Sequence, residues 1–206
     1  MDENNTNILI YHYFEKERGP FRSLSDVSDE EIKKILERSR TDDKETGKGT
    51  LLGSVYSDDN ITIRRRQEYM TRVTFVEKGG KPVRQFPYYA VLVRENDPTY
   101  DEGIKGRYKN GECLRIPVKN FDMTAVSFTY GDQCSNINPA EYENFLANTY
   151  RPPVYTYEEI LNVIAERGWI PYTGDGGWPR PWYIEAQIWN DDIILEKYRE
   201  YKNGKI

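Results

Sequence analysis

Histidine and cysteine are too scarce in this chain for the metal and disulfide chemistries that need several of either. A lone histidine, His12, cannot build a multi-histidine metal site. The two cysteines, Cys113 and Cys134, match neither a disulfide framework nor a zinc cluster. We therefore expect no metal cofactor, and we expect a reduced, cytoplasmic setting.

The chain also lacks long apolar runs and an excess of basic residues. No stretch approaches the roughly 18 apolar residues of a membrane span, and the acidic start Met1-Asp2-Glu3 is unlike a signal peptide. Lys and Arg number 29 against 34 Asp and Glu, so the formal net charge of −5 argues against a general nucleic-acid binder. We expect a nucleotide or a protein as partner, and neither a membrane nor a nucleic acid.

What is present is a succession of strand and helix signals that fits one α+β domain over residues 1–206. The sheet is expected to be mixed or mostly antiparallel, with about six strands flanked by helices. The strands are expected near residues 8–14, 71–77, 86–94, 112–118, 124–130 and 182–189.

Three segments carry weaker signals. Residues 1–7 are polar and expected to be disordered, and 41–53 has so little to bury that we expect a mobile loop. β-branched residues favour strands at 61–66 and 71–77, with a helix as the alternative. The sequence alone assigns no role to the three arginines of segment 61–66, which are Arg64, Arg65 and Arg66.

Capping signals predict the helices. Ser28 with Glu31 begins a helix over about 29–40, and Thr156 with Glu159 begins one that ends at Gly168. Pro139 is expected to open a short helix to about residue 148, and residues 191–201 a terminal one.

The stretch 182–189 is the most informative of the chain, because its alternation places apolar residues on one side and polar or aromatic ones on the other. One interpretation is an ordinary solvent-facing strand side whose polar groups meet cross-strand partners. The other is a carboxylate held between rings against a flat ligand. The second side consists of Tyr183, Glu185, Gln187 and Trp189.

Two further strands carry candidate site residues. His12 lies in the middle of the first strand, either satisfied by backbone groups or available as a donor or base to a ligand. A Ser-His-Asp hydrolase would need His12, and no G-x-S-x-G motif is present to supply its nucleophile. Ser127 and Thr129 place two hydroxyls on one strand face, where they pair across strands or hold a carboxylate or a ribose.

Segments 10–21, 127–132, 155–160 and 183–189 together resemble an uncharacterised family of bacterial proteins, mostly from firmicutes. This resemblance covers most of the chain and implies no particular activity. The order His12, Ser127 or Tyr130, and Glu185 on strands also resembles ADP-ribosyltransferase-like domains.

The second resemblance implies NAD as the ligand. It implies that His12 holds the nicotinamide ribose, that Tyr130 stacks on the nicotinamide and that Glu185 stabilises the oxocarbenium-like transition state. Many members carry a second Glu or Gln two residues before the catalytic Glu, whereas Gln187 follows it here.

The same stretch suggests how a ligand would be held at Glu185. Gln187 is placed to hold a sugar hydroxyl, and Tyr183 and Trp189 to exclude water. Because Glu185 points away from Ile184, we expect its loss to abolish activity and to leave the fold intact.

Two other classes of function remain as alternatives. Abundant Tyr and Trp suit a non-catalytic protein-binding module, for instance a phage-related, toxin-neutralising or defence-associated component. A metal-dependent nuclease would use Asp175 and Glu185, with Gln187 where such enzymes usually have Lys.

Overall fold

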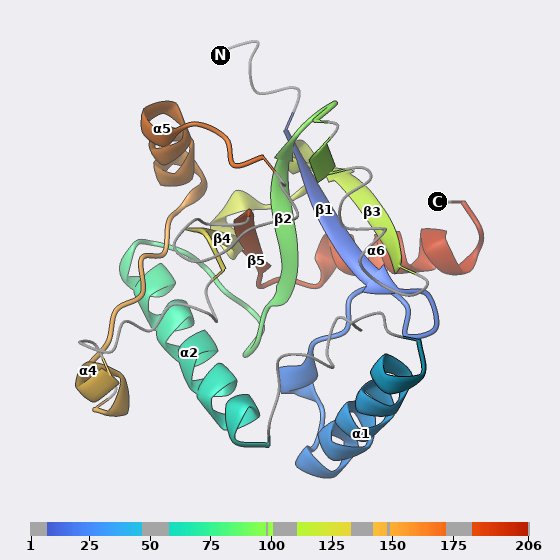
Figure 1. Ribbon diagram of the computed structural model, residues 1–206. Coiled ribbons are helices and arrows are strands. Elements are labelled where there is room, and N and C mark those ends of the chain that lie inside the picture. The colour runs from blue at the N-terminus through green and yellow to red at the C-terminus, as the bar shows by residue number, and fades with distance from the viewer. Residues whose placement is uncertain are drawn as a thin grey trace.

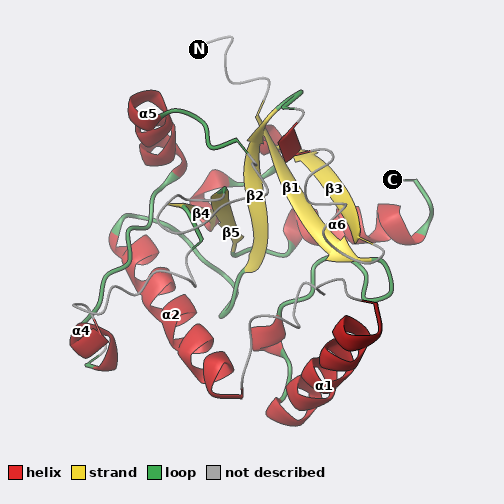
Figure 2. Cartoon of the chain, in the orientation of Figure 1, coloured by secondary structure: helices red, strands yellow, loops and turns green. Residues whose placement is uncertain are grey.

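The computed structural model describes residues 8–46, 58–97, 99–100, 111–132, 142–147, 149–171 and 183–205. Its centre is a five-stranded antiparallel sheet with the strand order β3-β1-β2-β5-β4, surrounded by helices (Figures 1 and 2). The α+β class is thus confirmed, with five strands in place of about six. The strands are β1 (Ile8–Glu15), β2 (Tyr88–Arg94), β3 (Gly111–Pro117), β4 (Val126–Tyr130) and β5 (Ile184–Ile188).

The helices among these residues include two long ones early in the chain and three shorter ones later. α1 (Asp29–Thr46) and α2 (Asp58–Glu77) precede β2. α4 (Tyr142–Leu146) and α5 (Tyr157–Arg167) lie between β4 and β5, and α6 (Asp192–Lys202) follows β5. Short 3-10 turns are η2 (Leu24–Asp26), η3 (Val118–Asn120) and η4 (Met123–Ala125).

One face of the sheet carries the main apolar core. Alternate residues of all five strands point to this face and meet buried residues of α5 and α6. We call it the core face. Its buried strand residues are Ile8, Ile10, Phe14, Ala90, Leu92, Leu114, Ile116, Val126, Phe128, Ile184, Ala186 and Ile188, and the helices add Ile160, Ile164 and Ile194.

The strands expected at 61–66 and 71–77 are wrong, and the alternative, a helix, is what forms there as α2. The β-branched residues pointed to strands, but the buried positions recur at helical spacing: Ile61, Glu68, Thr71 and Phe75. Because two of these are polar, the apolar periodicity that would have indicated a helix is missing from the sequence.

The loop expected at 41–53 is also corrected where the structure describes it, because α1 continues to Thr46. Residues 1–7, 47–53, Asp175 and the helix start at Pro139 lie outside the described residues. The helices begun by Ser28 and Thr156 and the terminal helix are confirmed.

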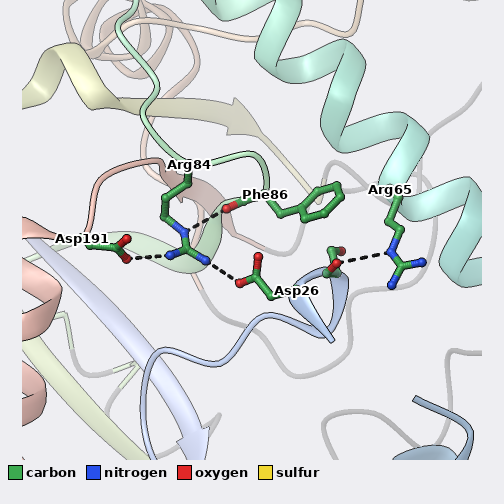
Figure 3. Close-up of polar contacts among 6 residues, drawn as sticks. Asp26, Arg65, Arg84, Phe86 and Asp191 are labelled. Carbon is green, nitrogen blue, oxygen red and sulfur yellow. Dashed lines mark hydrogen bonds and ion pairs between the residues drawn. The ribbon is translucent and has the colours of Figure 1, made fainter. Parts of the chain in front are cut away.

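One arginine joins three segments that are far apart in the sequence. The guanidinium of Arg84 pairs with Asp26 of η2 and, at 2.6 Å, with Asp191 ahead of α6. Its Nε donates to the carbonyl of Phe86 at 3.0 Å, as Figure 3 shows. The guanidinium also lies 3.9 Å from the ring centroid of Tyr88. The ion pairs and the hydrogen bond of Arg84 together tie η2 and the start of α6 to the segment that enters β2.

The capping box at Thr156 predicts a measurable stability loss. Thr156 Oγ1 accepts a hydrogen bond from the Glu159 amide, and the Glu159 carboxylate accepts one from the Thr156 amide at 2.9 Å. Thr156→Ala should lower the free energy of unfolding by about 1 kcal/mol. Ser28→Ala, which removes the acceptor for the Glu31 amide, should have a similar effect.

Urea denaturation of the full chain measures both losses. Thr156→Ser keeps the acceptor oxygen and is the matched control, which should unfold close to wild type. Wild-type midpoints for both alanine variants would contradict the capping role.

Candidate functional site

The face of the sheet opposite the core face is also buried. On β4 and β5 its residues are polar, whereas β1 and β2 contribute the buried Tyr11, Val91 and Val93 to it. We call it the polar face. Gln187 of β5 lies between Tyr89 of β2 and Ser127 of β4 in one row of cross-strand partners. Glu185 lies next to Thr129 in the adjacent row. All of β5 is buried, so Glu185 does not face solvent as an ordinary edge residue would.

Helix α2 covers this polar face. Phe75 of α2 packs with Trp189 and Val154 in a small buried cluster. Two of the buried polar side chains of α2 precede Phe75 on the same side of the helix, Thr71 by one helical turn and Glu68 by two. The layer between α2 and the sheet therefore contains apolar contacts at one end and polar groups along the rest.

A chain of hydrogen bonds runs along β4 and β5 and ends on Glu185. The indole Nε1 of Trp189 donates to Ser127 Oγ, which donates to Gln187 Oε1, both at 2.8 Å. Gln187 Nε2 then donates to Thr129 Oγ1 at 3.1 Å and to Glu185 Oε1 at 2.9 Å. Gln187 is 0% exposed and Glu185 4%.

The direction of this chain is determined by the chemistry of its two ends. The indole N–H of Trp189 can only donate to Ser127, and at the other end the Gln187 amide nitrogen donates to Glu185 Oε1. Ser127 must therefore use its own proton toward Gln187, which leaves the Gln187 amide nitrogen facing Glu185 and Thr129. Thr129 in turn donates to the carbonyl of Gly131 at 2.8 Å. Glu185 is thus held as an oriented carboxylate by residues that are themselves fixed.

A second carboxylate enters the polar face from α2. Glu68 is 0% exposed, and its Oε1 accepts hydrogen bonds from Arg64 Nε and from the Tyr89 hydroxyl, each at 2.9 Å. The Arg64 guanidinium also lies 4.4 Å from the centroid of the Tyr89 ring. The second oxygen, Oε2, is buried and accepts no hydrogen bond from any residue that the structure describes.

The two carboxylates belong to one layer. Tyr89, which holds Glu68, is the direct cross-strand partner of Gln187, which holds Glu185. Side chains of such partners lie within contact distance on the same side of a sheet. Glu185 therefore comes from the sheet and Glu68 from the helix, with Tyr89 and Gln187 side by side between them.

His12 lies on the core face, and both of its ring nitrogens are used by the backbone. Nδ1 donates to the Tyr89 carbonyl and Nε2 accepts from the Phe21 amide, each at 2.8 Å. The ring stacks on Phe21 at 4.5 Å. Burial lowers the pKa of His12 to about 4, with the Tyr89 bond acting in the opposite direction. His12 is thus a neutral residue that links β1 to the start of β2.

Tyr130 also belongs to the core face, since it pairs with Ile184 and packs against the main core. Its hydroxyl donates to the Gly168 carbonyl at 3.0 Å, and the Arg167 guanidinium lies 5.7 Å from its ring centroid. The sheet itself therefore separates His12 and Tyr130 from Glu185. The three residues therefore do not share the one ligand site that the resemblance implies, because strand alternation places them on opposite faces.

The other expected ligand-binding residues are brought together with Glu185, but as its supports. Ser127, Thr129 and Gln187 direct their polar atoms at one another and at Glu185. Trp189 is 0% exposed and packs on Phe75, so it is part of the interior. Tyr183 is half-buried beside Tyr11 and Val93 on the same face.

Arg64, Glu68 and Tyr89 are the site residues that the sequence did not reveal. The signal that could have found them is the spacing of Arg64 and Glu68, which is that of an i, i+4 ion pair on a helix. The neighbouring arginines have separate partners. Arg65 pairs with Asp29 at 2.7 Å, and Arg66 donates to the Leu146 carbonyl.

Comparison with known proteins adds no relative: no family model, no curated protein and no solved structure matches this chain. Among the described residues, no three His, Cys, Asp or Glu side chains gather in a way that could hold a metal ion. In the same part of the chain, no helix has the length and apolar character needed to span a bilayer.

The buried, neutral His12 predicts a specific pH dependence of stability. Its pKa is about 4 in the folded state, against the ordinary 6.5, so the unfolded chain binds this proton first as the pH falls. The free energy of unfolding should therefore decrease between pH 6.5 and 4, by about 3 kcal/mol from this group. The slope from this group fades as the pH rises past 6.5, because the unfolded chain then loses the proton as well.

Denaturant unfolding at a series of pH values measures this slope. His12→Gln retains one donor and one acceptor but does not titrate, so it is the matched comparison. Between pH 6.5 and 4, the free energy of unfolding of the variant should depend less on pH, by the slope that corresponds to about one bound proton. This difference in slope does not depend on the absolute stability of the variant. Equal slopes for the two proteins would mean that His12 does not carry the effect.

Proposed function

We propose that this protein binds a nucleotide of the NAD type on its polar face and cleaves the bond between nicotinamide and ribose, with Glu185 as the catalytic carboxylate. The observation that carries the proposal is the directed hydrogen-bond chain from Trp189 to Glu185. Burying a carboxylate is costly unless it is well supported, and Gln187, which donates to this one, is itself held by Ser127 and Thr129. Such an arrangement suits a group whose orientation matters to a reaction.

The reaction needs a fixed negative charge. As the N-glycosidic bond breaks, its electron pair leaves with nicotinamide and positive charge develops at the ribosyl carbon. A carboxylate already oriented in a site of low polarity stabilises that charge without reorganising. Water, or another acceptor hydroxyl, then bonds to the carbon and releases a proton, which gives ADP-ribose or its conjugate.

His12 and Tyr130 have other roles in this proposal than those that the resemblance implies. His12 and Tyr130 lie on the core face, so they do not contact the ligand in this proposal. His12 instead acts as a positioning residue, because its Nδ1 holds the carbonyl of Tyr89, whose side chain is on the polar face. Ser127, Thr129 and Gln187 position Glu185 in the same sense.

A second candidate, a protein-binding module, is favoured by one feature of the surface. Tyr69 and Val76 are exposed and lie seven residues apart on α2, which places them on one side of the helix. Val83 is also exposed. Its two neighbours in the sequence, Pro82 and Arg84, are held against α2, because their carbonyls accept hydrogen bonds from Arg72 of that helix. An exposed apolar group of this kind is typical of protein contacts.

Glu185→Gln tests the catalytic proposal. The variant keeps an oxygen that can accept from Gln187, so the fold should be retained, and it removes only the charge. We expect nearly normal binding of NAD in calorimetry and release of nicotinamide at least about 10²-fold slower than wild type.

Glu158→Gln is the matched control, since Glu158 is an exposed residue of α5 away from the polar face. It should leave both binding and turnover unchanged. An unfolded Glu185→Gln would make Glu185 structural, and wild-type turnover in a folded one would remove it from the reaction. Absence of any NAD binding by wild type would favour the protein-binding candidate.

A further inference from the structure

We infer that Glu68 is a second ligand-contacting carboxylate, whose Oε2 accepts hydrogen bonds from the hydroxyls of a bound sugar. The inference rests on the proposed function, because it concerns the ligand of the same polar face. Glu68 comes from α2 and Glu185 from β5, and Tyr89, which donates to Glu68, is the cross-strand partner of Gln187.

The two oxygens of Glu68 differ in their surroundings. Oε1 accepts from Arg64 and from Tyr89, whereas the buried Oε2 accepts from no described residue. Buried polar atoms are nearly always hydrogen-bonded in folded proteins, so a buried carboxylate oxygen of this kind points to a donor from outside the chain. Bulk solvent does not reach Glu68, which is 0% exposed, so the donor has to be a group enclosed between α2 and the sheet.

Charge decides which donor suits this position. Arg64 and Glu68 form a close ion pair whose side chains are almost fully buried. The carboxylate charge of Glu68 already has a counter-charge in Arg64, so Oε2 lacks a proton donor and not a second cation. A hydroxyl supplies the missing proton donor and leaves the charge balanced, which favours a sugar over an amine.

Position favours the ribose that Glu185 faces. Tyr89 donates to Glu68 and is the cross-strand partner of Gln187, which donates to Glu185. A ligand lying against Glu185 thus has its neighbouring groups beside Tyr89, on the side of Glu68. In the nicotinamide ribose, these neighbouring groups are the 2′- and 3′-hydroxyls next to the reacting carbon.

The test combines a change in the protein with a change in the ligand. Full-length wild type and Glu68→Gln are titrated calorimetrically with NAD and with an NAD analogue lacking the 2′- and 3′-hydroxyls of the nicotinamide ribose. Each single change should weaken binding about 10-fold or more, the scale of a hydrogen bond to a charged group. The two changes together should weaken binding little further than either alone, since they remove the same contact.

A second variant covers the case in which Glu68→Gln does not fold. Arg64→Met combined with Glu68→Met replaces the buried pair by apolar side chains and leaves no unpaired charge. It should bind NAD and the analogue equally, whatever its overall affinity. Glu77→Gln, in the exposed pair with Arg151, is the control and should keep the wild-type preference for NAD.

The outcomes separate this inference from the proposed function. If wild type binds NAD more tightly than the analogue, if this preference depends on Glu68, and if no nicotinamide is released, the inference is supported and the catalytic proposal is overturned. Nicotinamide release that depends on Glu185, with the same hydroxyl preference in wild type and both Glu68 variants, overturns the inference alone. Absence of binding of both ligands to wild type overturns both.

Discussion

The donor-only indole of Trp189 and the accepting Oε1 of Glu185 constrain the hydrogen bonds between them. The intervening Ser127 and Gln187 each have one arrangement that satisfies both ends. That arrangement needs β4 and β5 in one register, with Ser127 opposite Gln187 and Thr129 opposite Glu185. A slip of one residue would turn every one of these groups to the apolar face. The hydrogen bonds therefore specify strand pairing as well as the orientation of the carboxylate.

The two faces of the sheet bury different kinds of side chain. The core face buries apolar residues from all five strands against α5 and α6 and supplies the bulk of the hydrophobic stabilisation. The polar face, under α2, buries two carboxylates and an arginine at positions where apolar residues would pack with less cost. Proteins depart from their own folding rules chiefly at functional sites. The polar face is where this chain departs from an apolar interior, and the proposed site is placed there for that reason.

The same division explains what the sequence could predict. The class, the capped helices and the strands of the core face followed from apolar alternation and from caps such as Thr156, because those signals are local. Helix α2 was mistaken for strands because the residues it buries, such as Glu68 and Thr71, are polar. Strand alternation places Glu185 on the side of β5 opposite its apolar residues, but its burial depends on α2 and does not follow from the sequence.

His12 shows why the remaining site could not be assembled from the sequence. Its place in strand β1 was predicted, but its face relative to β5 depends on strand order, which no local pattern reports. The partners of its two nitrogens, the Tyr89 carbonyl and the Phe21 amide, come from other segments. Strand alternation then settles that His12 and Glu185 point in opposite directions.

The position of β5 between β2 and β4 affects how the chain folds while it is being synthesised on the ribosome. The strands β1, β2 and β3 emerge first and can pair at once, but β4 has no neighbour until the last strand arrives. Until then β2 presents a free edge of apolar residues, including Val91 and Leu92, to other nascent chains. A growing chain stalled before residue 184 is therefore a natural client for chaperones that shield strand edges.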